Sequence, residues 1–303
     1  MTISRAIWTL ITVCFLGLLP IHAPAQSLKV TLLGTGNPEP LIERFGPSIL
    51  VEAGSHKMLF DNGRGAMIRL GQKGISAADV PILFLTHLHS DHIVGISDLL
   101  LTGWLRGRDT PLRVFGPAGT KDMMQHLRQA YDADIRIRSS NARSTEGARI
   151  VARDISEGVV FEDGGVKVTA FTVDHGTAKP AFGYRVDYAG RSVVLSGDTG
   201  PTENLVHAAQ GVDLLVHEVS LRSGGATTGG STHTTPEEAG AIFSRVKPKL
   251  ALYSHIIPPE APADDFIVQT RKTYNGPLEM GEDLMTIEVG DRVQVTRFQK
   301  SSR

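Results

Sequence analysis

The chain has 303 residues, of which 41% are hydrophobic, and it carries a formal net charge of −1 at pH 7. This composition is typical of a globular protein, and nothing in it marks a general nucleic-acid binder, which would carry a basic stripe. The single cysteine, Cys14, falls in an N-terminal leader, so the mature protein is expected to have neither disulfides nor cysteine metal ligands.

The first 25 residues predict a secretory signal peptide. Arg5 supplies a positive charge, an apolar run extends from Ile7 to Leu19, and Ala23-Pro24-Ala25 is a small-residue cleavage site. The run is shorter than the roughly 20 apolar residues that a membrane span needs, which makes an uncleaved membrane anchor the weaker alternative. We therefore expect a periplasmic or secreted protein that leaves the membrane after cleavage, with residues 26–303 as one domain.

Apolar runs bounded by turn residues predict the first strands of the mature chain, at 28–33, 48–51, 57–60, 82–85 and 112–115. We expect one helix to end near Leu70 and another to span 120–131. The Gly34-Thr35-Gly36 segment is interpreted as a tight turn, because a lone pair of glycines is weak evidence for a phosphate loop. Residues 134–157 are irregular and rich in arginine, which predicts either a cationic rim over a site or a solvated loop.

The segment from His87 to His92 directly follows the strand predicted at 82–85. It places His87, His89, Asp91 and His92 within six positions, ahead of a helix-like pattern. Imidazole nitrogen and carboxylate oxygen are the ligands that zinc takes where thiolate is absent. Residues two apart in an extended segment point the same way, so His87 and His89 could bind one ion, with a second ion near Asp91 and His92. The alternative is a polar loop with incidental histidines.

The second half of the chain repeats this organisation. Strands are predicted at 166–173, at 182–188 and 191–196 as a hairpin, at 212–216 and at 250–253. Three of them end at His175, Asp198 and His255, where catalytic groups commonly gather. Singly, each histidine could be a core residue and Asp198 a helix cap. Together with the first cluster they make a set of seven candidate ligands.

Two further features lie between these strands. The strand at 212–216 ends at His217-Glu218, and a Gly- and Thr-rich loop at 223–235 carries His233. The run Thr235-Pro236-Glu237-Glu238 predicts a helix start, because it offers a threonine cap followed by proline and two acids.

This pattern of ligands resembles the metallo-β-lactamase superfamily. The resemblance implies an α/β fold, the αββα metallo-β-lactamase sandwich, with a two-metal site at the edge of the sheets. It also implies two Zn²⁺ ions, which another divalent metal such as Mn²⁺ could replace. The implied ligands are His87, His89 and His175 for one ion, Asp91, His92 and His255 for the other, and Asp198 as the bridge between them.

Within the superfamily the chain is similar to two branches. Matches to ribonuclease Z include residues 181–185, 196–199 and 233–235, while 100–104, 115–120 and 276–284 look closer to exported arylsulfatase-like hydrolases. Bacterial ribonuclease Z carries a long tRNA-gripping arm after the motif at 181–185. Here only residues 186–191 separate that motif from the next strand. The expected activity is therefore an exported two-zinc hydrolase of sulfate or phosphate esters, with a metal-bound hydroxide as nucleophile.

The resemblance also implies which residues act in catalysis, namely Asp91, His233 and Glu218. His233 would protonate the leaving oxygen or hold an anionic oxygen, and Glu218 would orient it. The alternative is that both residues only stabilise loops. His217 is expected to orient a ligand.

Several alternatives stay open at this point. Other enzyme activities are a ribonuclease Z-type phosphodiesterase and a lactonase or thioesterase, and a non-catalytic metal-binding protein is the remaining class. Trp104 or Phe182 could pack against an aryl leaving group, or both could be core residues. The expected partner is a small anionic ester rather than nucleic acid, and a homodimer is compatible with the sequence.

Overall fold

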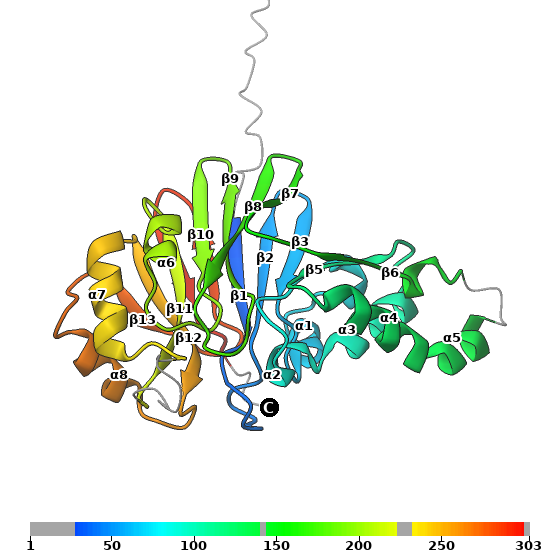
Figure 1. Cartoon of the computed structure of the whole chain (residues 1–303), viewed down its shortest axis with the longest axis horizontal. Coiled ribbons are helices and arrows are strands. Elements are labelled where there is room, and N and C mark those ends of the chain that lie inside the picture. The colour runs from blue at the N-terminus through cyan, green and yellow to red at the C-terminus, as the bar shows by residue number, and fades with distance from the viewer. Residues whose placement is uncertain (1–27, 140–143, 223–231, 300–303) are drawn as a thin grey trace, which may run out of the picture.

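The computed structural model describes residues 28–139, 144–222 and 232–299, which form two β-sheets packed face to face (Figure 1). Helices α6–α8 cover the outer face of one sheet and helices of the first half cover the other, so the layers run helix, sheet, sheet, helix. This is the αββα arrangement expected from the sequence. Within the described ranges, no helix has the length and apolar content that a membrane span needs.

The first sheet is eight-stranded, in the order β15-β14-β1-β2-β3-β4-β5-β6. Strands β3 to β6 run parallel, and the remaining neighbours pair antiparallel. The strand bounds are β1 Leu28–Gly34, β2 Ser48–Ala53, β3 His56–Phe60, β4 Ile82–Phe84, β5 Leu112–Gly116, β6 Ile150–Asp154, β14 Thr286–Val289 and β15 Val293–Thr296.

The second sheet is seven-stranded, in the order β13-β12-β11-β10-β9-β8-β7. Strands β10 to β13 run parallel, while β7, β8, β9 and β10 pair antiparallel in turn. The bounds are β7 Gly158–Asp163, β8 Val166–Val173, β9 Ala181–Tyr188, β10 Arg191–Leu195, β11 Leu214–Ser220, β12 Leu250–Ile257 and β13 Leu278–Met280.

The helices are mostly short and lie between strands. Helix α7 begins as the sequence predicts, because Thr235 caps it, Pro236 is its first residue, and Glu238 in the first turn completes a capping box with Thr235. The bounds are α1 Ala66–Gln72, α2 Ser90–Ile93, α3 Ile96–Leu105, α4 Thr120–Ala130, α5 Asp132–Ser139, α6 Glu203–Ala208, α7 Pro236–Val246 and α8 Ala263–Thr270.

Strand alternation divides the core between the layers. In β12, Leu250 and Leu252 face the opposite sheet, whereas Ala251 and Tyr253 pack under the outer helices. Both faces of the strand are therefore buried, which explains why its sequence is a continuous apolar run. Burial of this kind fixes the strand register, and the register in turn fixes where each strand end places its polar residues.

The topology brings the ends of several strands to one edge of the sandwich. Strands β8, β10, β11 and β12 point the same way, since β8 and β10 both run antiparallel to β9. The loops after β4, β8 and β10 therefore meet over a rigid scaffold.

Two expectations about local structure are corrected. The described residues of 134–157, which exclude 140–143, are not irregular, because they contain most of α5, a short 3-10 helix and strand β6. Three of their arginines are ion-paired and so do not contribute to a cationic rim, because Arg136, Arg138 and Arg149 pair with Asp132, Asp134 and Glu146. Helix α5 also projects at the far end of the molecule from β12 (Figure 1).

The Gly34-Thr35-Gly36 segment makes a close backbone approach rather than a phosphate loop. A Cβ atom at Gly34 would lie 1.9 Å from the carbonyl oxygen of Gly46. The amide of Thr35 donates to Asp283, so it is already occupied by a carboxylate.

Candidate metal centre

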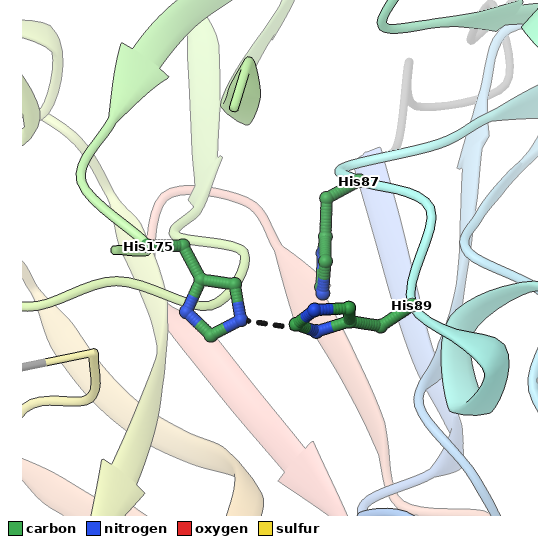
Figure 2. A group of neighbouring side chains, drawn as sticks. All are labelled: His87, His89 and His175. Carbon is green, nitrogen blue, oxygen red and sulfur yellow. Dashed lines mark hydrogen bonds between the residues drawn. The ribbon is translucent and has the colours of Figure 1, made fainter. Parts of the chain in front are cut away.

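A first triad of histidines forms where the loop after β4 meets the loop after β8. Figure 2 shows His87, His89 and His175 converging on one point from these two loops. Nε2 of His175 lies 3.2 Å from Nδ1 of His89. One nitrogen of each ring lies within 4.8 Å of the others, which is close enough for a single ion to bind all three.

A second triad lies beside the first and contains Asp91, His92 and His255. Asp91 and His92 occupy the short helix α2, and Nε2 of His255 lies 3.4 Å from Oδ2 of Asp91. His255 lies inside β12 rather than after it, which differs from expectation. The pairing of β11 with β12 skips His255, whose φ is 44°, so a β-bulge turns it out of the ladder and toward the site.

Asp198 lies between the two triads. Its Oδ2 atom is 3.3 Å from Nε2 of His92 and 3.1 Å from Nε2 of His255 on one side. On the other side it is 3.8 Å from His175 and 3.9 Å from His87. Gly197 before it has φ 62°, and a Cβ there would lie 2.6 Å from the carbonyl oxygen of Phe182. The turn that aims Asp198 therefore requires glycine.

Hydrogen bonds fix the imidazole tautomers so that Nε2 points into the site. Nδ1 of His92 donates to Asp61 at 2.7 Å, and Nδ1 of His175 donates to the carbonyl of Thr232 at 2.7 Å. Nδ1 of His87 lies 3.0 Å from the hydroxyl of Thr86, which itself donates to Asp61. Each ring therefore presents a lone pair on Nε2, as metal-binding histidines do.

The electrostatics of the site also fit cations. Nε2 of His87, Nε2 of His92 and Oδ1 of Asp198 are buried without a hydrogen-bond partner among the described residues. Burial lowers the pKa of His87 and of His175, so both favour the neutral form that binds metal. Burial opposes ionisation of Asp198, yet the neighbouring histidines hold its pKa well below the usual range. This donor set of imidazoles and carboxylates suits two divalent ions.

Sequence reasoning missed Asp61, which directly follows strand β3. Its carboxylate also accepts hydrogen bonds from the amide and hydroxyl of Thr86. It thus holds both His92 and the start of the ligand loop. Its position immediately after an apolar strand was an available signal, but the nearby glycines favoured interpretation as a turn.

His233 and Glu218 form an ion pair next to the triads. Nδ1 of His233 donates to Oε1 of Glu218 at 2.9 Å, and the same oxygen accepts the amide of Thr199 at 2.7 Å. Burial by itself lowers the pKa of His233, but the hydrogen bond to Glu218 and its charge raise that pKa to about 9. Cations bound in the triads would oppose this rise, because like charges disfavour protonation.

The ring of His233 lies 5.1 Å from that of His175 and 5.7 Å from that of His255. Its position beside the ligands fits a proton donor, although its reach would also permit metal binding. Glu218 lies inside β11 rather than after a strand end. Residues 223–231 of the predicted glycine- and threonine-rich loop lie outside the described residues.

The structure separates other candidates from the site. Trp104 and Phe182 are both buried in the core, so neither forms an aryl pocket. His217 packs on Phe243 and donates to the carbonyl of Glu218, and it does not orient a ligand. Among the other histidines, His126 and His207 are exposed, while His56 is half-buried against Phe161.

Comparisons with known proteins agree with this fold. Residues 49–256 match a family model described as a beta-lactamase superfamily domain. The chain is 36% identical over 275 residues to a protein named ribonuclease Z from Mycobacterium sp. strain KMS, covering 86% of this chain and 96% of the relative. A ribonuclease Z from Mycobacterium bovis BCG is 34% identical over 279 residues, covering 88% and 99%.

Solved structures share the fold. The metallo-beta-lactamase fold protein YhfI from Bacillus subtilis superposes with a TM-score of 0.71 at 19% identity, covering 86% of this chain and 99% of that one. The short form of human tRNase Z gives a TM-score of 0.62 at 23% identity, covering 86% and 99%.

Proposed function

Because this chain belongs to the metallo-β-lactamase superfamily, with ribonuclease Z among its relatives, we propose that it is a two-metal phosphodiesterase of the ribonuclease Z type. It is a metal-dependent hydrolase that acts on ester bonds. The observation that carries the proposal is the place of Asp198, whose Oδ2 atom lies 3.1 Å from His255 of one triad and 3.8 Å from His175 of the other. A carboxylate in this position can bridge two cations and partly neutralise them.

The residues would hold the two ions as the sequence predicts. His87, His89 and His175 would hold one, and Asp91, His92 and His255 the other. Zn²⁺ suits these nitrogen and oxygen donors, and Mn²⁺ is the expected substitute. When bound, the metal pair supplies Lewis acidity, which activates water near neutral pH and offsets charge on the ester oxygens.

His233 supplies the proton that the departing alcohol needs. A water oxygen forms the new bond to phosphorus, the ester P–O bond breaks, and its electron pair stays on the alcohol oxygen. That oxygen takes the proton from His233, one proton of the water restores His233, and the other proton stays on the phosphate monoester product. Glu218 keeps the imidazole oriented and its pKa raised. Asp91 lies next to the reacting position as a ligand in the second triad.

Two observations favour a phosphodiester over a sulfate ester as the substrate. Curated relatives at 34–36% identity are named ribonuclease Z. The aryl pocket that Trp104 or Phe182 could have formed is absent, because both side chains are buried in the core. Hydrolysis of sulfate esters, lactones or thioesters has no such support, and we treat each as an alternative activity.

The substrate we propose is a short phosphodiester rather than a folded tRNA. Strands β9 and β10 are joined at Ala189-Gly190 with no inserted arm between them. The net charge of −1 offers little attraction to a long polyanion. We also propose that the protein is exported, because of the predicted leader at residues 1–25, which lie outside the described range.

A substrate panel tests this function with the purified, zinc-loaded mature protein. We expect turnover of bis(4-nitrophenyl) phosphate to exceed that of 4-nitrophenyl sulfate, with little or no hydrolysis of a β-lactam. Preferential sulfate hydrolysis would refute the phosphodiesterase proposal. Efficient maturation of precursor tRNA would instead show that the chain keeps the full activity that its relatives' name describes.

A further inference from the structure

Two hollows flank the candidate metal centre and share the side chains of His89 and Thr177. The first, which we call the His233 hollow, has a volume of about 180 Å³ and also contains Asp198, His233 and His255. The second, the Lys179 hollow, has a volume of about 230 Å³ and lies on the side of His87. The metal centre therefore opens to two separate spaces, and proton donation from His233 explains only the first.

The Lys179 hollow has a mixed lining of apolar and polar side chains, with one cation at its rim. Its wall comes from loops of both sheets, after β4, after β5 and between β8 and β9. Lys179 is 70% exposed, and its Nζ lies 3.9 Å from Asp174, which is a loose ion pair. The apolar lining residues are Leu88, Pro117, Ala118, Ala178 and Pro180.

The geometry of phosphoryl transfer assigns these spaces to different parts of a substrate. Attacking and leaving oxygens lie roughly in line across phosphorus. The leaving alcohol must lie where His233 can protonate it, and that places it in the His233 hollow. The other organic substituent of a diester remains on phosphorus and needs a separate space. A sulfate ester or a phosphate monoester carries no second organic substituent, so it would leave the Lys179 hollow without a role.

We propose that the Lys179 hollow binds the substituent that stays on phosphorus, and that this substituent is an aromatic or heterocyclic ring bearing an acidic group. This inference rests on the proposed phosphodiesterase function and adds the substrate class. A cavity of roughly 150 Å³ holds benzene, so about 230 Å³ is ample for one ring. The ammonium of Lys179 at the rim favours a negative charge on the outer side of that ring.

Two phosphonate esters test the assignment with the zinc-loaded protein. 4-Nitrophenyl phenylphosphonate and 4-nitrophenyl methylphosphonate both release nitrophenol, but a carbon–phosphorus bond keeps the phenyl or methyl group in place. We expect kcat/KM to be at least about tenfold higher for the phenyl compound, because its ring is buried in the Lys179 hollow.

Ala118→Trp fills the Lys179 hollow and should bring this phenyl-to-methyl ratio close to one. Ala118→Ser leaves the space open and should keep the ratio, as should Ala133→Trp on α5, which controls for an added surface tryptophan. Equilibrium titration with the products phenylphosphonate and methylphosphonate should show the same loss of preference without depending on turnover.

The charge at the rim is tested by binding alone. We expect 4-carboxyphenylphosphonate to bind more tightly than phenylphosphonate, and Lys179→Gln to abolish the difference. Lys167→Gln, at an exposed position on β8, should preserve it.

The outcomes separate this proposal from the function on which it rests. If the native protein turns over both phosphonates with a ratio near one, the Lys179 hollow does not bind the retained substituent. A ratio that Ala118→Trp does not change leads to the same conclusion. Either result leaves the proposed phosphodiesterase function standing. Turnover of 4-nitrophenyl sulfate without turnover of any phosphorus ester overturns both.

Discussion

The carboxylate of Asp61 lies 2.7 Å from Nδ1 of His92, on the ring edge opposite the nitrogen that faces Asp198. A histidine held in this way presents Nε2 to the site with its lone pair free, and the charge of Asp61 makes that nitrogen a better donor. The pair therefore links the end of β3 to the second triad.

Asp61→Asn is expected to weaken binding of the ion held by the second triad by about 10- to 100-fold, the usual effect of losing such a partner. Asparagine tolerates the φ of 56° at this position, so the backbone should persist. Competition with a zinc chelator measures the change. Asp213→Asn removes another buried carboxylate, at the start of β11, and should lower stability without altering metal affinity. Equal affinities in the native and Asp61→Asn proteins would exclude the orienting role.

Asp198→Ala should leave the fold intact, lower the metal content from about two ions toward one, and abolish hydrolysis. The physical reason is that the remaining histidines lose the negative charge that offsets two adjacent cations. Elemental analysis and circular dichroism check both parts. Asp264→Asn, at an exposed position on α8, is the control. Full activity with one tightly bound ion in Asp198→Ala would contradict a bridging carboxylate.

His233→Ala should retain both metals yet slow turnover by about 10²- to 10⁴-fold, the range for a lost general acid. The loss should be greatest for alkyl leaving groups and small for nitrophenolate, which departs without a proton. A series of diesters that differ in leaving-group pKa measures this dependence. His126→Ala, on the exposed face of α4, should change nothing. A uniform loss across the series would indicate positioning instead of proton transfer.

Acid should destabilise the metal-free protein through His217, which burial keeps neutral by lowering its pKa to about 4. As the pH falls below about 6.5, the unfolded chain protonates this histidine and the folded protein does not. Stability is therefore lost between pH about 6.5 and about 4, by roughly 3 kcal/mol at most. Urea unfolding of the native and His217→Asn proteins at pH 7 and pH 5 isolates this contribution. An identical pH dependence in the two proteins would refute it.

Export should remove residues 1–25. Mass spectrometry of periplasmic or secreted material is expected to find an N-terminus at Gln26, because Ala23-Pro24-Ala25 fits signal peptidase. Recovery of the intact chain in the cytoplasm would contradict export and would favour a role in tRNA processing.

The sequence by itself determined most of the buried strands and the set of candidate ligands, while the αββα layers were implied by the resemblance to the superfamily. Long apolar runs predicted the buried strands, and polar residues just beyond them, such as His87, His175 and Asp198, marked the edge where chemistry occurs. This worked because burial sets the register of a strand locally, so a residue past the end of the strand must leave the core.

Only the tertiary structure decided which of these residues meet and what supports them. The β-bulge that turns His255 into the site depends on pairing between β11 and β12, and the contact of Asp61 with His92 joins residues 31 positions apart. Trp104 and Phe182 are buried in the core for the same reason. Such outcomes depend on partners brought together by long-range packing, which local patterns of hydrophobicity and charge do not encode.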